Sequence, residues 1–106
     1  IGEVTGVGDG PPTAAGAGLA GWPNPFNPRT TVRFDLPREG RVELAVYDLQ
    51  GRRVRTLLAG NAAAGPHEVL WPGDDDAGRA LPSGVYLARL RGPQGSSAER
   101  KLTLVR

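Results

Sequence analysis

The fold is decided by a stretch in which apolar and polar residues alternate strictly, Thr31-Val32-Arg33-Phe34-Asp35-Leu36. A period of two places its apolar side chains on one face of the chain, which is the pattern of a half-buried β-strand. The same period returns after a turn at 37–40, over 41–47, and continues towards the C-terminus. The stretch therefore predicts that the chain is built from β-strands.

Six segments of the chain show this alternation, and turn-forming residues separate them. The segments are 31–36, 41–47, 52–58, 67–71, 84–91 and 98–105. A seventh strand is expected around 19–22, and no window carries the 3.6-residue apolar period of a capped helix. Short strands separated by turns at this spacing predict an all-β fold, a two-sheet sandwich of about seven antiparallel strands.

Irregularities in the pattern predict how individual strands are placed. Asp48-Leu49-Gln50-Gly51 has the residues of a hairpin turn, and the slip at Leu57-Leu58 predicts a β-bulge or a strand end. Small residues predict a loop at 59–66, and a longer connection rich in Asp, Gly and Pro follows at 72–83. Segment 84–91 has apolar residues on both faces, so we expect it in the middle of a sheet. The inward-facing positions predict a core of Val32, Phe34, Leu36, Val42, Leu44, Val46, Val69, Trp71, Tyr86, Leu90, Leu102 and Leu104.

Composition limits the function classes further. The chain has 106 residues, of which 13 are basic and 11 acidic, for a net charge of +2. It has no cysteine, which excludes disulfides, thiolate chemistry and zinc held by cysteines. No apolar run reaches the roughly 18–20 residues that span a bilayer, so no membrane span is expected. The arginines alternate with apolar residues instead of clustering with stacking aromatics, so we expect no nucleic-acid binding.

The most distinctive string is Trp22-Pro23-Asn24-Pro25-Phe26-Asn27-Pro28. Its prolines fix φ and remove amide donors, so the string cannot pair as an ordinary strand. We expect a rigid elbow that leads from an edge strand into the sandwich, with Phe26 in the core.

Several strings, in order and with natural spacing, resemble the C-terminal immunoglobulin-like domains of secreted bacterial proteins. That family includes the Ig-like domain of the flagellar hook-capping protein and the type A sorting domain of type IX secretion. The strings are 24–28, 31–36, 46–52, 65–71, 76–78, 81–86 and 101–106. The family motif residues within or beside them are Asn24, Pro25, Phe26, Asn27, Pro28, Trp71, Gly78, Ser83, Gly84 and Tyr86.

The resemblance implies an immunoglobulin-like sandwich over residues 19–106 and a function without catalysis or cofactor. Such domains sit at the end of exported proteins and act as sorting, anchoring or assembly modules. We therefore expect a bacterial structural protein module, extracellular or on the cell surface, with protein partners. The partners would be the secretion or anchoring machinery, or identical subunits.

Residues 1–18 lie outside the resemblance, and their Gly and Pro content predicts an extended arm or linker. The chain begins at Ile1 without an initiator Met, so we expect a processed product or an excerpt of a longer protein. In an alternative interpretation, Ile1, Val4 and Val7 add a strand to the sheet edge of a neighbouring copy, and repetition of this contact builds a filament, a homo-polymer.

A binding module is a further alternative. Asp74 and Asp76 are candidate Ca²⁺ ligands, although their spacing lacks the alternation and distal Glu of a calcium loop, and an exposed turn is the other interpretation. A carbohydrate-binding module using 72–82 would need exposed aromatic side chains, of which the sequence offers few. His67 and Ser83 do not predict a hydrolase, because Ser83 lacks the glycine-flanked turn of a nucleophile elbow.

Overall fold

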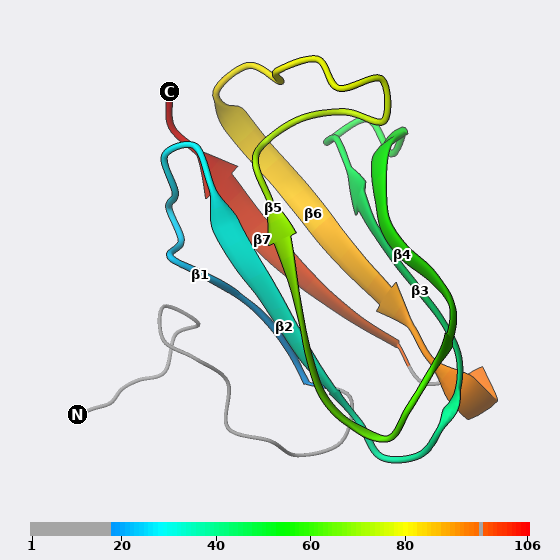
Figure 1. Ribbon diagram of the computed structural model, residues 1–106. Coiled ribbons are helices and arrows are strands. Elements are labelled where there is room, and N and C mark those ends of the chain that lie inside the picture. The colour runs from blue at the N-terminus through cyan, green and yellow to red at the C-terminus, as the bar shows by residue number, and fades with distance from the viewer. Residues whose placement is uncertain (1–17, 96) are drawn as a thin grey trace.

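Seven antiparallel strands form two sheets in the computed structural model of the chain, which describes residues 18–95 and 97–106 (Figure 1). The strands are β1 (Leu19–Trp22), β2 (Thr30–Leu36), β3 (Gly40–Tyr47), β4 (Arg53–Ala62), β5 (Gly65–Trp71), β6 (Gly84–Arg91) and β7 (Ser97–Leu104). A 3-10 turn, η2 (Pro93–Gly95), precedes β7. No helix in these described residues is long and apolar enough to cross a membrane.

The strands divide into a three-stranded sheet, in the order β1-β2-β5, and a four-stranded sheet, in the order β4-β3-β6-β7. The predicted all-β sandwich is therefore confirmed. Strand β6 lies between β3 and β7, as its two apolar faces predict. In the register of the smaller sheet, Val32 stands opposite Gly21 and Val69, and Thr31 stands opposite Trp22 and Leu70. Because side chains alternate between faces, the first row points into the sandwich and the second row points outward.

The inner faces of both sheets pack against each other to form one core. Every predicted core residue is buried except Val69, which is only half-buried because β5 is an edge strand. Phe26 is buried as expected. Leu19 and Ala88 also belong to the core although they are not among the predicted core residues; Ala88 lies on the same face of β6 as Tyr86 and Leu90.

Strands β4 and β5 both extend into the segment that was predicted to be a loop. The bulge expected at Leu57-Leu58 is confirmed, because the register shifts after Leu44 pairs with Leu58 and Ala45 pairs with Thr56. The loop predicted for 59–66 is wrong, since β4 continues to Ala62 and β5 begins at Gly65. Residues 59–62 pair with β3, and residues 65–66 pair with β2. Backbone pairing of this kind needs no large side chain.

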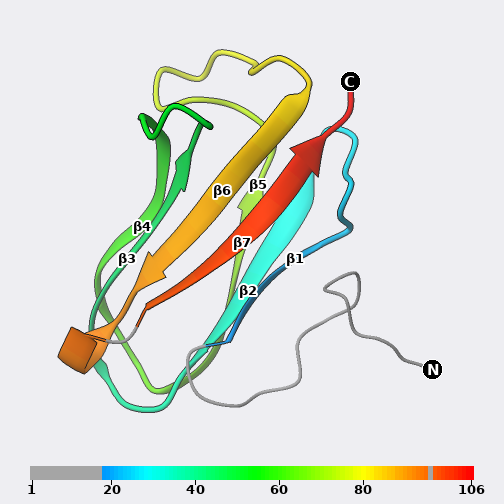
Figure 2. The same cartoon turned by 180° about the vertical axis from the view of Figure 1, so that it is seen from behind.

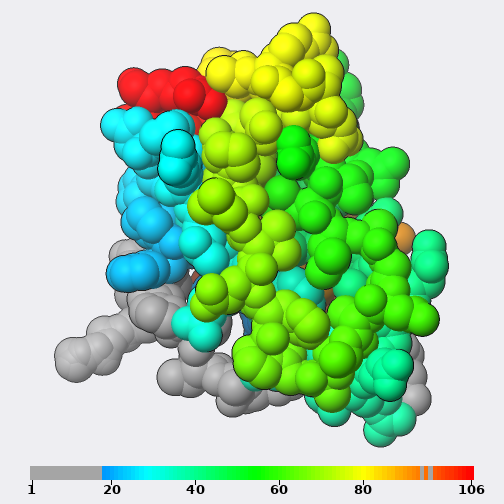
Figure 3. Space-filling view, viewed as in Figure 1, coloured from blue at the N-terminus to red at the C-terminus, as the bar shows by residue number. Residues whose placement is uncertain are grey.

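The two long sides of the sandwich are closed to different degrees. On one side β1 lies against β7, where the Arg100 guanidinium donates a hydrogen bond to the Leu19 carbonyl oxygen at 3.0 Å (Figure 2). A Cβ at Gly21 would collide with Leu102, so glycine permits this close approach. On the other side the strands β4 and β5 belong to different sheets. Side chains of β4 and β5 meet over this side in the space-filling view (Figure 3).

The apolar residues of that second side are incompletely covered. Strand β4 has no fully buried residue, and its apolar side chains pack against the core only in part. They are Val54, Leu57, Leu58 and Ala62, and Val69 of β5 completes the set. The core is therefore better shielded from water on the β1/β7 side than on the β4/β5 side.

Candidate functional site

Most of the family motif residues meet at one end of the sandwich, which we call the loop end. It is formed by 22–29, 48–52, 72–83 and 105–106. The loop 72–83 and the C-terminus lie at the top of Figure 1. The sequence predicted the individual motif residues, whereas the structure shows that long-range contacts join them.

Phe26 docks the proline elbow onto the last strand. Its amide donates to the Thr103 carbonyl oxygen at 2.9 Å, and its carbonyl oxygen accepts from the Val105 amide at 2.8 Å. Phe26 thereby forms an isolated parallel bridge with Leu104. The ring itself is buried, 5.4 Å from the ring of Trp71.

Asn24 extends this docking with its side chain. The amide nitrogen donates to the Lys101 carbonyl oxygen at 2.8 Å, and the amide oxygen accepts from the Thr103 amide at 2.9 Å. The Asn24 side chain thus makes hydrogen bonds to β7 that the proline-interrupted backbone does not make. Together Asn24 and Phe26 cover the outer edge of β7, which protects this edge from pairing with other chains.

Trp71 and Tyr86 fix the long connection between β5 and β6. Their rings meet edge to face at 5.7 Å, and the Trp71 indole donates to the Asp74 carbonyl oxygen at 2.9 Å. The Tyr86 hydroxyl donates to the Pro82 carbonyl oxygen at 2.7 Å, four residues upstream. A tyrosine near a strand start that bonds back to the preceding backbone is the arrangement of a tyrosine corner. Burial raises the pKa of the Tyr86 phenol, and the charge of Arg106 opposes this shift.

Arg106 occupies the inside of the same connection. Its amide donates to the Ser83 hydroxyl oxygen at 2.8 Å, and its guanidinium donates to the carbonyl oxygens of Leu81 and Gly73 at 2.5 and 2.7 Å. Gly73 has φ +74°, and a Cβ there would lie 3.0 Å from both the Arg106 guanidinium and the Pro28 carbonyl oxygen. The sequence placed Ser83 in the family motif but gave no signal for this contact.

Two turns with the same sequence spacing, Asp-x-x-Gly-Arg, shape the loop end. In the first turn the Asp48 carboxylate accepts from the amides of Gln50 and Arg52, each at 3.0 Å, and from the Arg52 guanidinium. In the second, the Asp75 carboxylate accepts from Ala77 and Arg79 in the same way. Gly78, a motif residue, closes the second turn at φ +82°, and its amide donates to the Asp75 carbonyl oxygen.

These hydrogen bonds stabilise the ionised carboxylates. The backbone amide of Arg52 is the main cause that lowers the pKa of Asp48 below its ordinary value. The backbone amide of Arg79 does the same for the pKa of Asp75. The sequence pattern points to the two neighbours of Asp75, as candidate calcium ligands, and not to Asp75 itself. The repeated spacing Asp-x-x-Gly-Arg was the signal that could have found it.

The carboxylates of Asp74 and Asp76, the candidate calcium ligands, face protein groups. Asp74 accepts from the Arg55 guanidinium at 3.2 Å, and Asp76 accepts from the Thr56 amide at 2.9 Å. Asp76 also donates its amide to the Val54 carbonyl oxygen, which covers part of the outer edge of β4. In the part of the chain that the structure describes, no group of three or more His, Cys, Asp or Glu could hold a metal ion. The geometry favours the interpretation of this run as a turn anchored to β4.

The other residues singled out from the sequence lie on β5, at the start of β6 and in the elbow. His67 lies on β5, stacks on the Phe34 ring at 5.0 Å and has its Nε2 atom 2.7 Å from the Ala63 carbonyl oxygen. Gly84 begins β6, and Pro25, Asn27 and Pro28 complete the elbow. Ile1, Val4 and Val7 lie outside the described residues. Among the described residues, the exposed large apolar side chains are Trp22, Leu49, Leu70 and Val105.

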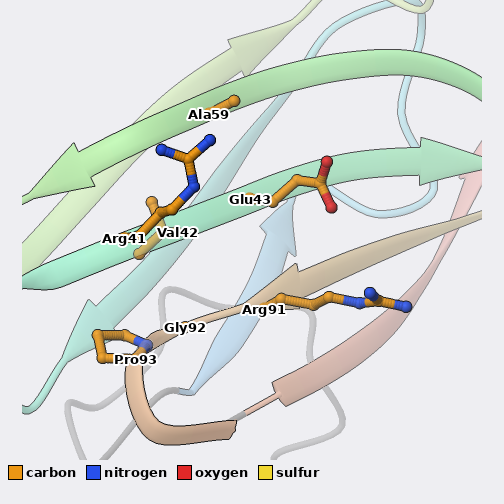
Figure 4. A pocket seen from close by; sticks show the side chains of 7 residues that line it. All are labelled: Arg41, Val42, Glu43, Ala59, Arg91, Gly92 and Pro93. Atoms are coloured by element: carbon orange, nitrogen blue, oxygen red, sulfur yellow. The ribbon is translucent and has the colours of Figure 1, made fainter.

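A hollow lies on the outer face of the four-stranded sheet, away from the loop end (Figure 4). Its volume is about 420 Å³, and it is lined by Arg41, Val42, Glu43, Ala59, Arg91, Gly92 and Pro93. Figure 4 shows the Arg41 side chain directed towards β4, whereas Arg91 extends from β6 on the other side of β3. The sequence interpretation of the arginines as a solvated strand face did not identify this hollow.

The fold and the loop end define an immunoglobulin-like β-sandwich module. The chain belongs to the family of FlgD Ig-like domains, whose model matches residues 27–96. This confirms the resemblance noted from the sequence strings. Domains of this family are non-catalytic modules.

Two solved structures are similar to the chain. FlgD from P. aeruginosa is 27% identical, with a TM-score of 0.56 over 72% of this chain and 60% of FlgD. PorZ, an essential surface component of the type-IX secretion system of Porphyromonas gingivalis, is 21% identical, with a TM-score of 0.55 over 84% of this chain and 12% of PorZ. The likeness to PorZ shows the fold alone, and the chain spans less than two thirds of either protein. No protein with a curated function matches the sequence.

The lowered pKa values of Asp48 and Asp75 predict a specific loss of stability in acid. A carboxyl group whose pKa is lower in the folded than in the unfolded state stabilises the fold above the unfolded pKa, and this stabilisation is lost as pH falls towards the folded pKa. We expect the double variant Asp48→Asn, Asp75→Asn to be less stable than the wild type at pH 7. The difference should shrink as pH falls below about 4, near the ordinary Asp pKa.

Urea unfolding between pH 7 and pH 2 measures this difference. Asp35→Asn serves as the control, since Asp35 lies on β2 and not in either turn. Parallel stability curves for the wild type and the double variant over the whole pH range would contradict the prediction.

Proposed function

We propose that the chain is a non-enzymatic module that sorts or anchors a larger exported bacterial protein at the cell surface. Residues 19–106 would be the module and residues 1–18 a linker to preceding domains. Its partners would be proteins of the secretion or anchoring machinery, and it would need no cofactor.

Membership in the FlgD Ig-like family carries this proposal. The likeness in fold to PorZ, a surface component of a secretion system, supports an extracellular setting. The loop end supports it as well, because its polar groups bond to the protein itself. Asp74, Asp75, Asp76, Ser83 and Arg106 all hold backbone or side-chain partners. Groups used in this way hold the loops of the module in place, and they are not free for chemistry.

Secretion of a fusion protein tests the proposed function. The full chain, placed after a folded reporter with an export signal, should bring the reporter to the surface of a bacterium that has type-IX secretion. A matched strain without that secretion system should retain the reporter inside the outer membrane. Equal retention in both strains, with the module folded, would contradict the proposal.

Strand addition is a second candidate function, favoured by the edge of β5. This strand lies at the end of its sheet, and its outer edge makes no main-chain hydrogen bond with another described segment. The neighbouring apolar side chains of β4 are only half-buried. An unpaired edge beside incompletely covered apolar residues can accept an extended segment. We propose residues 1–18 of a neighbouring copy as that segment, with Val4 as an apolar anchor.

Sedimentation and negative-stain microscopy test strand addition. The intact chain should form filaments or large oligomers, whereas a chain lacking 1–18 should not. Val4→Asp, which keeps the length of the arm, should weaken assembly. Monodisperse monomers of the intact chain would exclude this second candidate.

A further inference from the structure

The outer face of the four-stranded sheet carries an excess of positive charge. Its charged residues, which the strand register places on one face, are Arg41, Glu43, Arg53, Arg89, Arg91, Glu99 and Lys101. Five cations and two carboxylates give 5 − 2 = +3, which exceeds the net charge of +2 for the whole chain. The outer face of the other sheet has Arg33, Asp35 and Glu68, which sum to 1 − 2 = −1. The molecule is thus polarised across its two broad faces.

Both carboxylates on the positive face already have partners. Glu43 pairs with Arg53 at 3.1 Å, and Glu99 pairs with Arg89 at 2.6 Å. The Arg89 guanidinium also stacks over the Tyr47 ring at 4.8 Å. Within residues 18–95 and 97–106, Arg41 and Arg91 have neither an ion pair nor a hydrogen bond from their guanidinium groups. These two cations are the available ones beside the hollow.

The hollow gives the two arginines a shaped surface. A second hollow, of about 430 Å³, is lined by Arg89, Arg91, Ser97, Ala98 and Glu99. Both hollows share Arg91, so they adjoin across β6. Ala59 and Pro93 add apolar walls to the first hollow. Apolar walls reduce the exposure of a bound carboxylate to water, which strengthens its attraction to a guanidinium.

The register sets the spacing of the two arginines. Arg91 stands opposite Glu43, and Arg41 lies two residues before Glu43 on the same face of β3. Such diagonal neighbours have Cα atoms about 7–8 Å apart. Residues two apart in an extended peptide are separated by about 6.5–7 Å, on the same side of the peptide. Two acidic residues that alternate with neutral ones therefore match the Cα spacing of Arg41 and Arg91.

We propose that this face binds an extended acidic segment of a partner protein, with carboxylates at alternate positions contacting Arg41 and Arg91. Arginine binds carboxylates through two parallel hydrogen bonds, which adds orientation to the charge attraction. The inference deepens the proposed function, because it rests on the partner being a protein and names the surface and the chemistry of recognition. It assigns a role to the four-stranded sheet that is separate from the loop end.

Peptide binding in solution tests this site without secretion. The probe is a fluorescein-labelled peptide of alternating Glu and Thr, titrated with the full chain and followed by fluorescence anisotropy. We expect saturable binding that weakens as salt is raised. Arg41→Gln and Arg91→Gln should each lower the affinity by roughly two- to fivefold, and the double variant should lower it further.

Matched controls separate the site from general charge attraction. Arg38→Gln removes the same charge from the exposed turn before β3, outside both hollows, and should leave the affinity within about twofold of the wild type. A peptide with Gln in place of Glu should not bind. A peptide with the same Glu residues in one block should bind more weakly than the alternating peptide.

Three results would overturn the proposal. They are unchanged affinity in the Arg41→Gln, Arg91→Gln double variant, an equal loss in Arg38→Gln, and equal binding of a galacturonate oligosaccharide. The last result would assign the site to an acidic sugar. None of these results bears on surface secretion of the fusion protein, so failure of this inference is distinguishable from failure of the proposed function.

Discussion

Phe26 joins the beginning of the sandwich to its end, and the closure of the fold depends on this contact. Its ring fills the space between the sheets beside Trp71, while its backbone pairs with β7 on both sides of Leu104. Asn24 adds two side-chain hydrogen bonds to the same strand. Replacing a buried phenylalanine by alanine costs about 3–5 kcal/mol. A small domain has only about 5–15 kcal/mol of stability, so this one residue accounts for a large share of it.

The docking of Phe26 also explains why charged residues at the loop end are structural. The segment after Phe26 and the end of β7 enclose Gly73, and Arg106 fills the remaining space with hydrogen bonds to Gly73 and Leu81. The two Asp-x-x-Gly-Arg turns and the Arg55–Asp74 pair use their carboxylates within the protein. We therefore propose that partner recognition uses surfaces that the described residues leave uncovered. These surfaces are the positive face of the four-stranded sheet and the outer edge of β5.

The sequence predicts the parts of the fold that depend on local periodicity. Alternation places Phe34 and Leu44 in the core, and the slip at Leu57 marks the bulge, because each depends on side chains a few residues apart. The family motif adds the positions of Phe26, Trp71 and Tyr86. The motif does not predict which side chains contact one another or which backbone groups they bond.

Contacts between distant segments explain what the sequence did not predict. Asn24 and Thr103 are far apart in the chain, and no local pattern links them. Calcium-ligand spacing points to Asp74 and Asp76, whereas the Asp-x-x-Gly-Arg spacing points to Asp75, the residue that caps the turn. The continuation of β4 to Ala62 follows from backbone pairing with Gly40, which small residues make without any hydrophobic signal. The hollow at Arg41 and Arg91 arises only when β3 and β6 lie side by side.

Native-state hydrogen exchange of Phe26→Ala tests the central role of this residue most directly. The amides of Thr103 and Val105, which bond to Asn24 and Phe26 respectively, report the docking of the elbow on β7. We expect a loss of about 3–5 kcal/mol in unfolding free energy and a loss of protection at both amides. The control Asn27→Ala changes an exposed residue of the same elbow and should stay within about 0.5 kcal/mol of the wild type. A Phe26→Ala protein with wild-type stability and full protection of Thr103 and Val105 would contradict the account.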